Sequence, residues 1–351
     1  MSTGTSRKGS KSTPTAEPRA RVKLVDVARA AGVSPTTVSH ALNSRGWVDP
    51  KTREHVKQTA ARLGYRPNHH AQQLRTGEAR TIVLVSSMPF AVAGGPSRLG
   101  FLMEIAAAAA SIALARGLAL VLAPPIEGAA AALDRLDFDG ALVVEPAASD
   151  PQIAAFVARG LPVVSIGKPP LASVPFVDLH SAATTRQLLD HLRARGARRI
   201  ALVTGAQRRT AYLEAVTAYE AFAARHRMAP IVKRIDEGEG EEGGRAAARG
   251  LLLESPSIDA ICVPVDALAA GVVQELVAQG RHVPQDVMVA TRYDGIRART
   301  SEPPLTALDL HLDAVATLAV DMLLGRLRGD AIEPQAEVQA AELVARASTA
   351  R

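Results

Sequence analysis

The sequence predicts a small, all-α N-terminal domain followed by a larger α/β region built on parallel sheets. Helical patterns run from about Leu24 to Leu63. From Thr81 onward, short apolar runs alternate with amphipathic helical stretches, which is typical of βαβ units. The charge also divides the chain. Residues 1–80 hold 15 Lys or Arg and 5 Asp or Glu, a net +10, whereas residues 81–351 hold 26 and 30, a net −4.

Just after the polar first 20 residues, the pattern is that of two short helices joined by a glycine turn. Apolar residues fall on one face of residues 24–31, and Gly32 stands where a left-handed turn would end that helix. Ser34 is a good N-cap, and Pro35 suits the first position of a second helix over residues 35–42. This pattern describes a helix-turn-helix, whose second helix enters the major groove of DNA. Spacing alone also allows a generic helical hairpin.

The basic N-terminal region is the electrostatic signature of a nucleic-acid-binding module attached to a mildly acidic body. A basic solubilising tail is the alternative explanation. The low share of aromatic residues, 3%, favours an α/β body over a β-sandwich. With one cysteine in the sequence, an internal disulfide framework is excluded.

The body contains too many strand–helix units for one compact sheet, which predicts two similar α/β lobes. Ligands of parallel sheets bind at the carboxyl ends of the strands, so a cleft between the lobes is the natural site. The expected strands are Thr81–Val85, Leu118–Leu122, Gly140–Val144, Pro162–Ile166, Ile200–Val203, Asp259–Val263 and Val287–Ala290. The expected helices include Phe101–Ala115, Ala182–Ala194, Tyr212–His226, Ala267–Gln279 and Leu312–Leu327.

A series of motifs in the first 77 residues resembles the LacI/GalR family of bacterial transcription regulators. The motifs are Val25-Asp-Val-Ala, Gly32-Val-Ser, Thr37-Val-Ser-His-Ala-Leu-Asn43, Leu63-Gly-Tyr-Arg-Pro-Asn68 and Leu74-Arg-Thr-Gly77. The body resembles, more loosely, that family's two-lobed effector domain, which is related to periplasmic sugar-binding proteins. The resemblance implies a ligand-responsive transcription regulator, usually a repressor, that binds double-stranded DNA as a homodimer.

From these patterns and the resemblance we expect a disordered basic tail at residues 1–20, a helix-turn-helix domain at 21–66, a hinge helix or linker at 67–77 and a two-lobed effector-binding and dimerisation domain at 78–351. Within the last, lobe 1 covers about 80–179 and 309–330, and lobe 2 covers about 180–308 and the C-terminal segment.

The resemblance assigns base reading to Pro35, Thr36 and His40. Pro35 offers only apolar contact, for example to a thymine methyl group, and Thr36 can donate, accept or present its methyl. Many family members carry Arg at the position of His40, so a softer preference is expected there. Trp47 is expected to pack the three-helix core, with base stacking as the lesser alternative. The residues expected to contact phosphates are Ser34, Thr37, Ser39, Asn43 and Arg53.

The hinge segment is expected to form a short helix in the minor groove when two copies meet. Asn68 would cap it, Ala71 is small enough for the groove floor, and Leu74 would act as an apolar wedge. Simple interdomain packing is the other interpretation of Leu74. The wedge implies a homodimer on a pseudo-palindromic operator.

For the effector the resemblance points to positions where the family's ligand contacts lie. The family's usual pocket Arg is replaced near Tyr212, and its usual Asp after the fourth strand is Gly167, followed by Lys168. An anion held by Arg98, Lys168 or Arg292 is therefore an alternative to a sugar; surface salt bridges are the competing role for these cations. The effector candidates are Phe101, Lys168, Tyr212, Asp266, Arg292, Tyr293 and Asp294.

Other function classes fit less well. The segment Gly238–Gly243 matches a dinucleotide-binding fingerprint, but its glutamates oppose a pyrophosphate, so we expect a solvated acidic loop. No cofactor or metal is expected. An α/β enzyme, or a solute-binding protein with a non-specific basic head, remains the alternative. Without an apparent signal peptide or membrane span, we expect a cytoplasmic protein.

Overall fold

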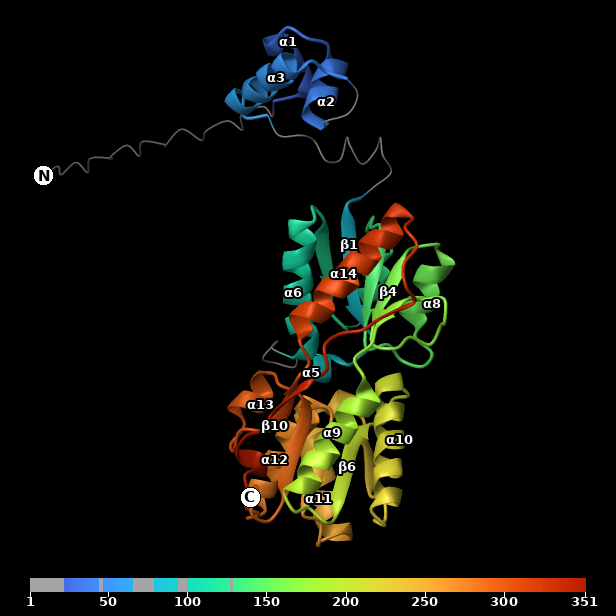
Figure 1. The fold of residues 1–351 in the computed structure, drawn as a ribbon, viewed down its shortest axis with the longest axis vertical. Coiled ribbons are helices and arrows are strands. Elements are labelled where there is room, and N and C mark those ends of the chain that lie inside the picture. Colours follow the sequence, from blue (N-terminus) through green and yellow to red (C-terminus); the bar gives the residue numbers. More distant parts are fainter. Residues whose placement is uncertain (1–21, 44–46, 66–78, 94–99, 127–128) are drawn as a thin grey trace, which may run out of the picture. The chain divides into compact units, whose positions relative to one another are not determined.

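The computed structural model describes residues 22–43, 47–65, 79–93, 100–126 and 129–351. The chain forms a small unit over Met1–Gly77 and a large unit over Glu78–Arg351 (Figure 1). The small unit is helical and the large one contains two sheets, as the sequence predicts. In the described part of the chain, no helix has the length and apolar character needed to cross a membrane.

The small unit consists of helices α1 (Leu24–Ala31), α2 (Pro35–Asn43) and α3 (Pro50–Arg62). Gly32 ends α1 in the left-handed conformation, with φ +66°, and its backbone N–H bonds to carbonyls of that helix. Asp49 caps α3, its carboxylate accepting from two backbone N–H groups at 3.0 Å. The core of the unit is made of small aliphatic side chains, namely Val27, Ala28, Ala31, Val38, Ala41, Val56 and Ala60.

Trp47 does not join this core, which corrects the prediction from the sequence. Its side chain is 90% exposed. The space between the helices is filled by valines and alanines, and Leu63 and Tyr65 pack at its edge. These side chains fill the small core at normal packing density, and no space remains in it for an indole ring. The Trp47 side chain therefore lies on the surface.

The first lobe is a six-stranded sheet in the order β11-β5-β4-β3-β1-β2, and the paired strands run parallel. Its strands are β1 (Thr81–Ser86), β2 (Ala119–Ala123), β3 (Gly140–Val144), β4 (Val163–Ile166), β5 (Phe176–Val177) and β11 (Gln335–Ala336). Its helices are α5 (Phe90–Ala93), α6 (Phe101–Ala115), α7 (Ala129–Leu133), α8 (Pro151–Ala158) and α14 (Leu312–Arg328).

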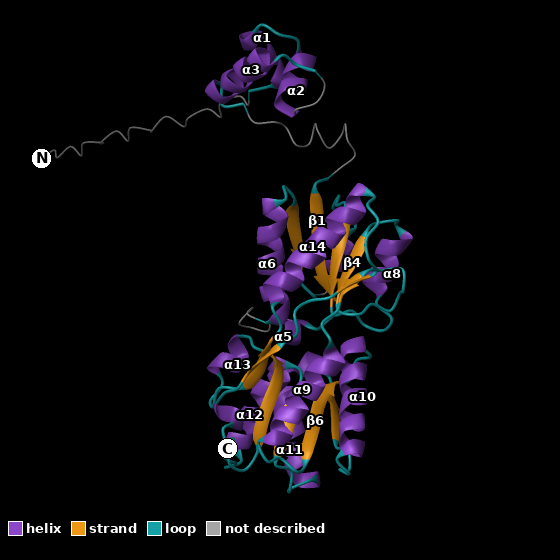
Figure 2. Ribbon diagram, viewed as in Figure 1, coloured by secondary structure: helices purple, strands orange, loops and turns teal. Residues whose placement is uncertain are grey.

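The second lobe is also six-stranded, in the order β12-β10-β9-β8-β6-β7, with the edge strand β12 antiparallel. Figure 2 shows the strands of the large unit in orange and its helices in purple. Its strands are β6 (Ile200–Gly205), β7 (Val232–Ile235), β8 (Ala260–Val263), β9 (Met288–Tyr293), β10 (Thr306–Asp309) and β12 (Glu342–Val344). Its helices are α9 (Ser181–Ala194), α10 (Thr210–Arg225), α11 (Gly240–Glu254), α12 (Asp266–Ala278) and α13 (Ile296–Thr300), with 3-10 turns η1 (Glu237–Glu239) and η2 (Ala347–Thr349).

Both sheets are covered on both faces, which explains why their strands are apolar runs. In β1, Ile82 and Leu84 belong to the core beneath α6 and α14, whereas Val83 and Val85 face the cluster that contains Phe156 of α8.

All seven predicted strands form, each beginning within one residue of its expected start. The five predicted helices begin within two residues of theirs.

The chain passes between the lobes three times: from β5 to α9, from β10 to α14, and from β11 to β12. The last passage differs from the division expected from the sequence. Residues beyond 330 were expected in the second lobe, but Gln335 and Ala336 first add a parallel strand to β5 of the first lobe. A strand of two residues is too short to show a hydrophobic period.

The acidic segment near Gly238 is also different from the expected loop. It forms η1 and the beginning of α11, and the side chain of Glu237 is fully buried. Two glycines beside this segment, Gly244 of α11 and Gly271 of α12, allow the two helices to pack closely. A Cβ on Gly244 would lie 2.1 Å from the carbonyl oxygen of Leu268, and one on Gly271 would lie 1.8 Å from that of Glu241. Glycine is therefore required where the two helices touch.

Candidate nucleic-acid interface and interlobe pocket

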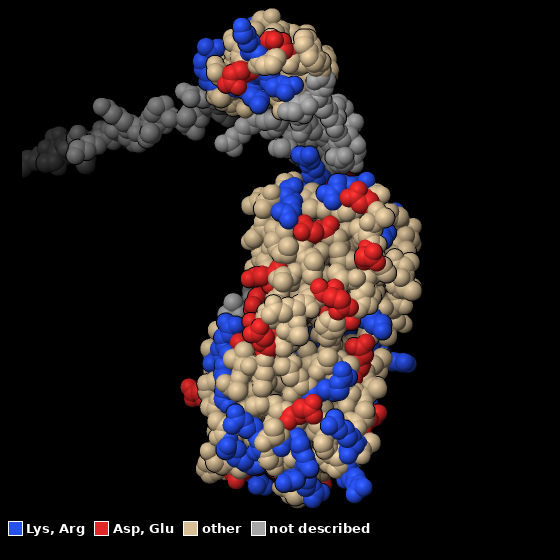
Figure 3. Space-filling view, in the orientation of Figure 1, with Lys and Arg blue, Asp and Glu red and all other residues tan. Residues whose placement is uncertain are grey.

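Helix α2 presents a polar face because its apolar side is buried in the small core. Val38 and Ala41 are fully buried, whereas Pro35, Thr36 and His40 are exposed. The three predicted base-reading residues therefore share an accessible helix surface. On the visible face of this unit, Figure 3 shows Lys and Arg side chains together with some Asp and Glu side chains; the cations can attract phosphates.

The predicted phosphate contacts begin at the α2 N-terminus. Ser34 is exposed; its Oγ accepts from the Thr37 backbone N–H at 3.1 Å and lies 2.8 Å from the Thr37 Oγ1. Ser39 and Thr37 are half-buried. Arg53 lies on α3 and is half-buried, and its Nε has no hydrogen-bond partner among the described residues. Helix N-termini of this kind offer backbone N–H groups to a phosphate.

Some predicted DNA contacts lie outside what the structure describes. The backbone of Asn43 ends α2, but its side chain is not among the described ones. Asn68, Ala71 and Leu74 all lie outside the described residues. Their assignment to a minor-groove hinge stays a prediction.

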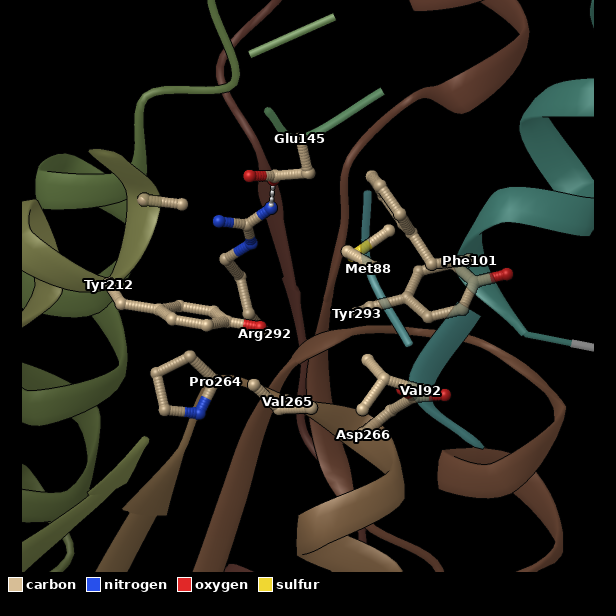
Figure 4. Close-up of a pocket in the computed structure, with 11 residues that line it drawn as sticks. Met88, Val92, Phe101, Glu145, Tyr212, Pro264, Val265, Asp266, Arg292 and Tyr293 are labelled. Atoms are coloured by element: carbon tan, nitrogen blue, oxygen red, sulfur yellow. Dashed lines mark hydrogen bonds and ion pairs between the residues drawn. The ribbon is translucent and has the colours of Figure 1, made fainter. Parts of the chain in front are cut away.

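A pocket lies between the two lobes of the large unit, at the carboxyl ends of the parallel strands (Figure 4). The cavity itself is small, about 40 Å³; all the space between the lining atoms, including the part open to solvent, is about 470 Å³. The first lobe supplies residues from the end of β1, from α5 and α6, and from the turn after β3. The lining residues are Met88, Val92, Phe101, Glu145, Ala211, Tyr212, Pro264, Val265, Asp266, Arg292 and Tyr293.

Five of the seven predicted effector residues lie in this lining. Phe101 of the first lobe meets Tyr293 of the second edge-to-face, with ring centroids 5.3 Å apart. The Tyr293 hydroxyl donates to Glu104 of α6. Burial raises the pKa of the Tyr293 phenol, so it remains a donor at neutral pH. The five residues are Phe101, Tyr212, Asp266, Arg292 and Tyr293.

Lys168 and Asp294 do not line the pocket. The side chain of Lys168 is 57% exposed and pairs with Glu214 at 3.9 Å. Asp294 forms an ion pair with Arg346 at 2.7 Å. Of the three cations considered for an anionic ligand, Arg98 lies outside the described residues, which leaves Arg292 as the described cation in the lining.

Arg292 is already engaged by the chain itself. Its Nη2 bonds to the Glu145 carboxylate across the pocket, and its Nη1 donates to the Ser181 Oγ at 2.9 Å. Glu145 follows β3 and has a left-handed backbone conformation, with φ +47°. A residue other than glycine keeps such a conformation only where its surroundings hold it there. Reasoning from sequence missed Glu145. The sequence signal that could have identified Glu145 is a charged residue directly after an entirely apolar strand.

A second guanidinium, that of Arg209, was also missed from sequence and joins the two lobes next to the pocket residue Glu145. Arg209 precedes α10 and is 2% exposed. Its Nε donates to both carboxylate oxygens of Glu237 at 3.1 and 3.2 Å. Its Nη1 donates to the Ser87 Oγ at 2.9 Å and to the Glu145 carbonyl at 3.0 Å. Burial raises the pKa of Glu237, and the Arg209 charge opposes that rise.

Asp266 opens α12 and is paired in the same way. The Arg297 Nη1 donates to its carboxylate at 3.1 Å. Burial raises the pKa of Asp266, while the Arg297 charge and hydrogen bond lower it. Tyr212, whose pKa is raised by burial and by the charge of Glu237, completes this wall as a neutral phenol. The pocket can thus hold a small molecule between aromatic faces and fixed polar groups.

Comparisons with known proteins agree with both parts of this arrangement. A model of bacterial regulatory proteins, lacI family, matches residues 23–68, and one of a periplasmic binding protein-like domain matches residues 189–349. The HTH-type transcriptional regulator CelR of Thermobifida fusca is 31% identical over 342 residues, covering 95% of this chain and 99% of that protein.

Solved structures also resemble nearly the whole chain, among them the following two. The lac repressor dimer bound to operator and the anti-inducer ONPF matches with a TM-score of 0.77 at 27% identity, covering 94% of this chain and 99% of that one. A CelR–cellobiose complex matches with a TM-score of 0.67 at 28% identity, covering 93% and 100%.

Proposed function

The chain belongs to the lacI family of bacterial transcription regulators, and from this premise we propose that its small unit binds a pseudo-palindromic operator while a small molecule in the interlobe pocket changes operator affinity. Such a regulator works in the cytoplasm, where the DNA lies. The observation that carries the proposal is the exposed face of α2, with Pro35, Thr36 and His40 on a helix anchored by buried Val38.

Each of the three residues has a distinct chemical capacity for reading bases. Pro35 supplies an apolar contact such as one to a thymine methyl, and Thr36 supplies a hydroxyl and a methyl group. His40 can donate one hydrogen bond to N7 or O6 of guanine, without the forked geometry of arginine. Ser34, Thr37, Ser39, Asn43 and Arg53 would fix the orientation of the unit on the phosphates.

The operator would be bound by a homodimer, with two copies of α2 in successive major grooves. The lac repressor structure, to which this chain is similar, is that of a dimer on its operator. Asn68, Ala71 and Leu74 are assigned to the hinge on sequence resemblance alone, with Leu74 as the minor-groove wedge.

The pocket supports the effector part of the proposal. CelR, a relative of similar length, has been solved as a complex with cellobiose, so a small molecule between the lobes is reasonable here. A ligand that binds one arrangement of the lobes better than another would shift the population of DNA-binding dimers.

Selection from a random double-stranded DNA library tests the DNA-binding proposal. Wild type should recover a palindrome, and His40→Ala should lose preference at one base pair of each half-site. A loss of about 1 kcal/mol, a factor of about five, is expected for one neutral hydrogen bond. His55→Ala, which removes an exposed imidazole from α3, is the matched control and should leave the palindrome unchanged.

A Leu74→Ala variant in the same selection tests the wedge, and it should bind the palindrome more weakly. If wild type selects no sequence and its binding only fades as salt rises, the small unit is a non-specific basic head and the proposal fails.

A further inference from the structure

The end of the second lobe that points away from the interlobe pocket carries a cluster of arginines. There α9 and α10, which pack against each other, both end, and the chain turns back into β6 and β7 (Figure 1). We call residues 193–199 and 225–231, which form these two turns, the distal arginine face. The face contains six arginines and no Asp or Glu. The arginines are Arg193, Arg195, Arg198, Arg199, Arg225 and Arg227.

The arginines of this face have no counter-ion in the described part of the chain. None of them forms an ion pair with a residue that the structure describes, and five of the six are exposed. The sixth, Arg193, donates from its Nη1 to the Ala197 carbonyl at 3.0 Å. Glu254, at the end of α11, pairs with Lys233 at 2.6 Å. Figure 3 shows Lys and Arg side chains gathered at this end of the large unit, among some Asp and Glu side chains.

Hydrogen bonds fix the backbone of both turns. Asp259, just before β8, accepts from the backbone N–H of Arg198 at 2.8 Å. The Tyr219 hydroxyl of α10 donates to the Ile200 carbonyl at 2.7 Å and accepts from the Ile231 N–H at 2.9 Å, which joins the two turns. Because the backbone is fixed in this way, a partner that binds the face has to order only the arginine side chains.

A position at a helix end explains only some of these arginines. Arg193 and Arg225 stand in the last turns of α9 and α10, where the helix dipole favours a cation. That effect falls off within the last turn, whereas Arg198 and Arg199 lie beyond the end of α9. The helix ends therefore do not account for the arginines nearest to β6.

The chemistry of the face fits the phosphates of duplex DNA better than it fits a protein. A protein interface needs an apolar or aromatic centre. The other exposed residues of the face are instead Ala194, Gly196, Ala229 and Pro230. Guanidinium groups form two parallel hydrogen bonds with a phosphate, and each phosphate that they neutralise releases counter-ions from the DNA.

We propose that the distal arginine face is a second DNA-binding surface, which holds the phosphate backbone of a duplex without reading its sequence. It acts beside the small unit, to which the proposed function assigns the operator. A dimer whose small units occupy an operator then holds a second segment of duplex through this face. DNA near the operator is present at a high effective concentration, so a weak, non-specific affinity suffices.

Chemical modification of arginines tests this surface without an operator. Full-length protein is treated with phenylglyoxal, which reacts with free guanidinium groups, with and without an excess of a short duplex of random sequence. Mass spectrometry then gives the reaction rate at each arginine. At a duplex concentration about four times the dissociation constant, mass action leaves about one fifth of the face free, so Arg198, Arg199 and Arg227 should react about fivefold more slowly.

Exposed arginines elsewhere on the large unit are the internal control. Arg135, Arg186, Arg234 and Arg326 are exposed and form no ion pair with a described residue, and the duplex should not change their rates. Equal protection of both sets would overturn the proposal, and so would unchanged rates at the face. Protection of the face by polyglutamate but not by DNA would assign it to an acidic protein partner, and the proposal would fail.

Capture of a second duplex tests the same surface in the regulator bound to its operator. Full-length protein is loaded onto the immobilised, selected operator, and a fluorescent duplex of unrelated sequence is added at low salt. Wild type should retain this duplex, and retention should fall steeply as salt rises. A variant with Arg198→Gln, Arg199→Gln, Arg225→Gln and Arg227→Gln should retain at least about tenfold less, because four phosphate contacts are removed. Its affinity for the operator should not change.

The matched control carries Arg135→Gln, Arg186→Gln, Arg234→Gln and Arg326→Gln, which is the same change in charge outside the face. It should retain the second duplex as wild type does. Equal loss in both variants would show that net charge is responsible, and full retention by the first variant would show that another surface binds; either result overturns the proposal, as does no retention by wild type. The modification experiment needs no operator, so failure of the proposed function and failure of this proposal are told apart.

Discussion

Arg209 of the second lobe reaches Ser87 of the first with two donors: its Nη1 lies 2.9 Å from the Ser87 Oγ and its Nη2 lies 2.8 Å from the Ser87 carbonyl oxygen. The same guanidinium meets Glu237 through its Nε. All three guanidinium nitrogens of Arg209 therefore donate hydrogen bonds: Nε to the Glu237 carboxylate in its own lobe, and Nη1 and Nη2 to Ser87 in the other lobe. Arg209 is therefore a structural link between the lobes, next to the pocket residue Glu145.

Removing that link should be strongly destabilising. Arg209→Ala leaves Glu237 buried without its partner, for which a loss of about 3–5 kcal/mol is expected. Replacing both partners, as Arg209→Met with Glu237→Leu, should recover most of the loss because no buried charge remains. Denaturant unfolding followed by circular dichroism measures both. If Arg209→Ala alone lowered the free energy of unfolding by less than about 1 kcal/mol, the Arg209 guanidinium would not be buried and paired as described.

The close contact between α11 and α12 makes a second prediction. Gly271→Ala would place its Cβ 1.8 Å from the Glu241 carbonyl oxygen, so the helices must move apart and stability should fall by about 1–3 kcal/mol. Gly250→Ala on α11 is the matched control, since the nearest atoms to its Cβ would be 3.9 Å away. It should stabilise by up to about 1 kcal/mol through helix propensity. Equal effects at the two positions would refute the contact.

Cys262 in β8 should be inert in the folded protein. It is fully buried, and burial raises the pKa of its thiol from 9.0 to about 12. Ellman's reagent should react with it only in denaturant, at a rate that follows unfolding of the large unit. Because the unfolded thiol ionises first, its contribution to stability is complete below about pH 9 and is lost as the pH rises toward 12. Rapid labelling of native protein would show that β8 is accessible.

The exposed Trp47 makes a prediction about the small unit. Trp47→Ala should change the stability of this unit by less than about 0.5 kcal/mol, as for a surface position. Val38→Ala, which removes two methyl groups from the core, should cost about 2 kcal/mol. Thermal melts of the two variants measure both changes in stability. Iodide should also quench the emission of Trp47, the single tryptophan, in native protein; a shielded indole would argue against the exposed position.

The strands of the body could be predicted because burial on both faces makes each a continuous apolar run. The edge strands β5, β11 and β12 could not, because two or three residues carry no period. Helix α11 was missed for a different reason. Its first five residues, 240–244, are rich in glycine and glutamate, which indicate a loop. The close approach of Gly244 to the Leu268 carbonyl of α12 shows why glycine is needed at that position.

The pocket was predictable only in part. The resemblance to the family pointed to Phe101, Asp266 and Tyr293, which lie at strand and helix ends. The pairing of Glu145 with Arg292 joins residues 147 positions apart, and that of Arg209 with Glu237 joins residues 28 apart. Neither pair has a local signature, because each depends on how the lobes and loops meet. Trp47 shows the converse, as composition favoured a core residue that the small helices do not accommodate.

His40 makes the sharpest prediction for the DNA-contacting face. His40→Arg replaces one donor with a fork that can bond both acceptors of a guanine, so discrimination at that base pair should rise by about 1–3 kcal/mol. His55→Arg adds the same charge to an exposed position of α3 and is the matched control. It should strengthen binding to all sequences and steepen the salt dependence without changing specificity.

Competition between the selected operator and its single-base variants, at one fixed salt concentration, separates the two effects. A specificity gain confined to one symmetric pair of base pairs in His40→Arg identifies His40 as a base-reading residue. If both arginine variants raise affinity equally for all sequences, the side chain at position 40 does not read a base, and base reading rests with Pro35 and Thr36.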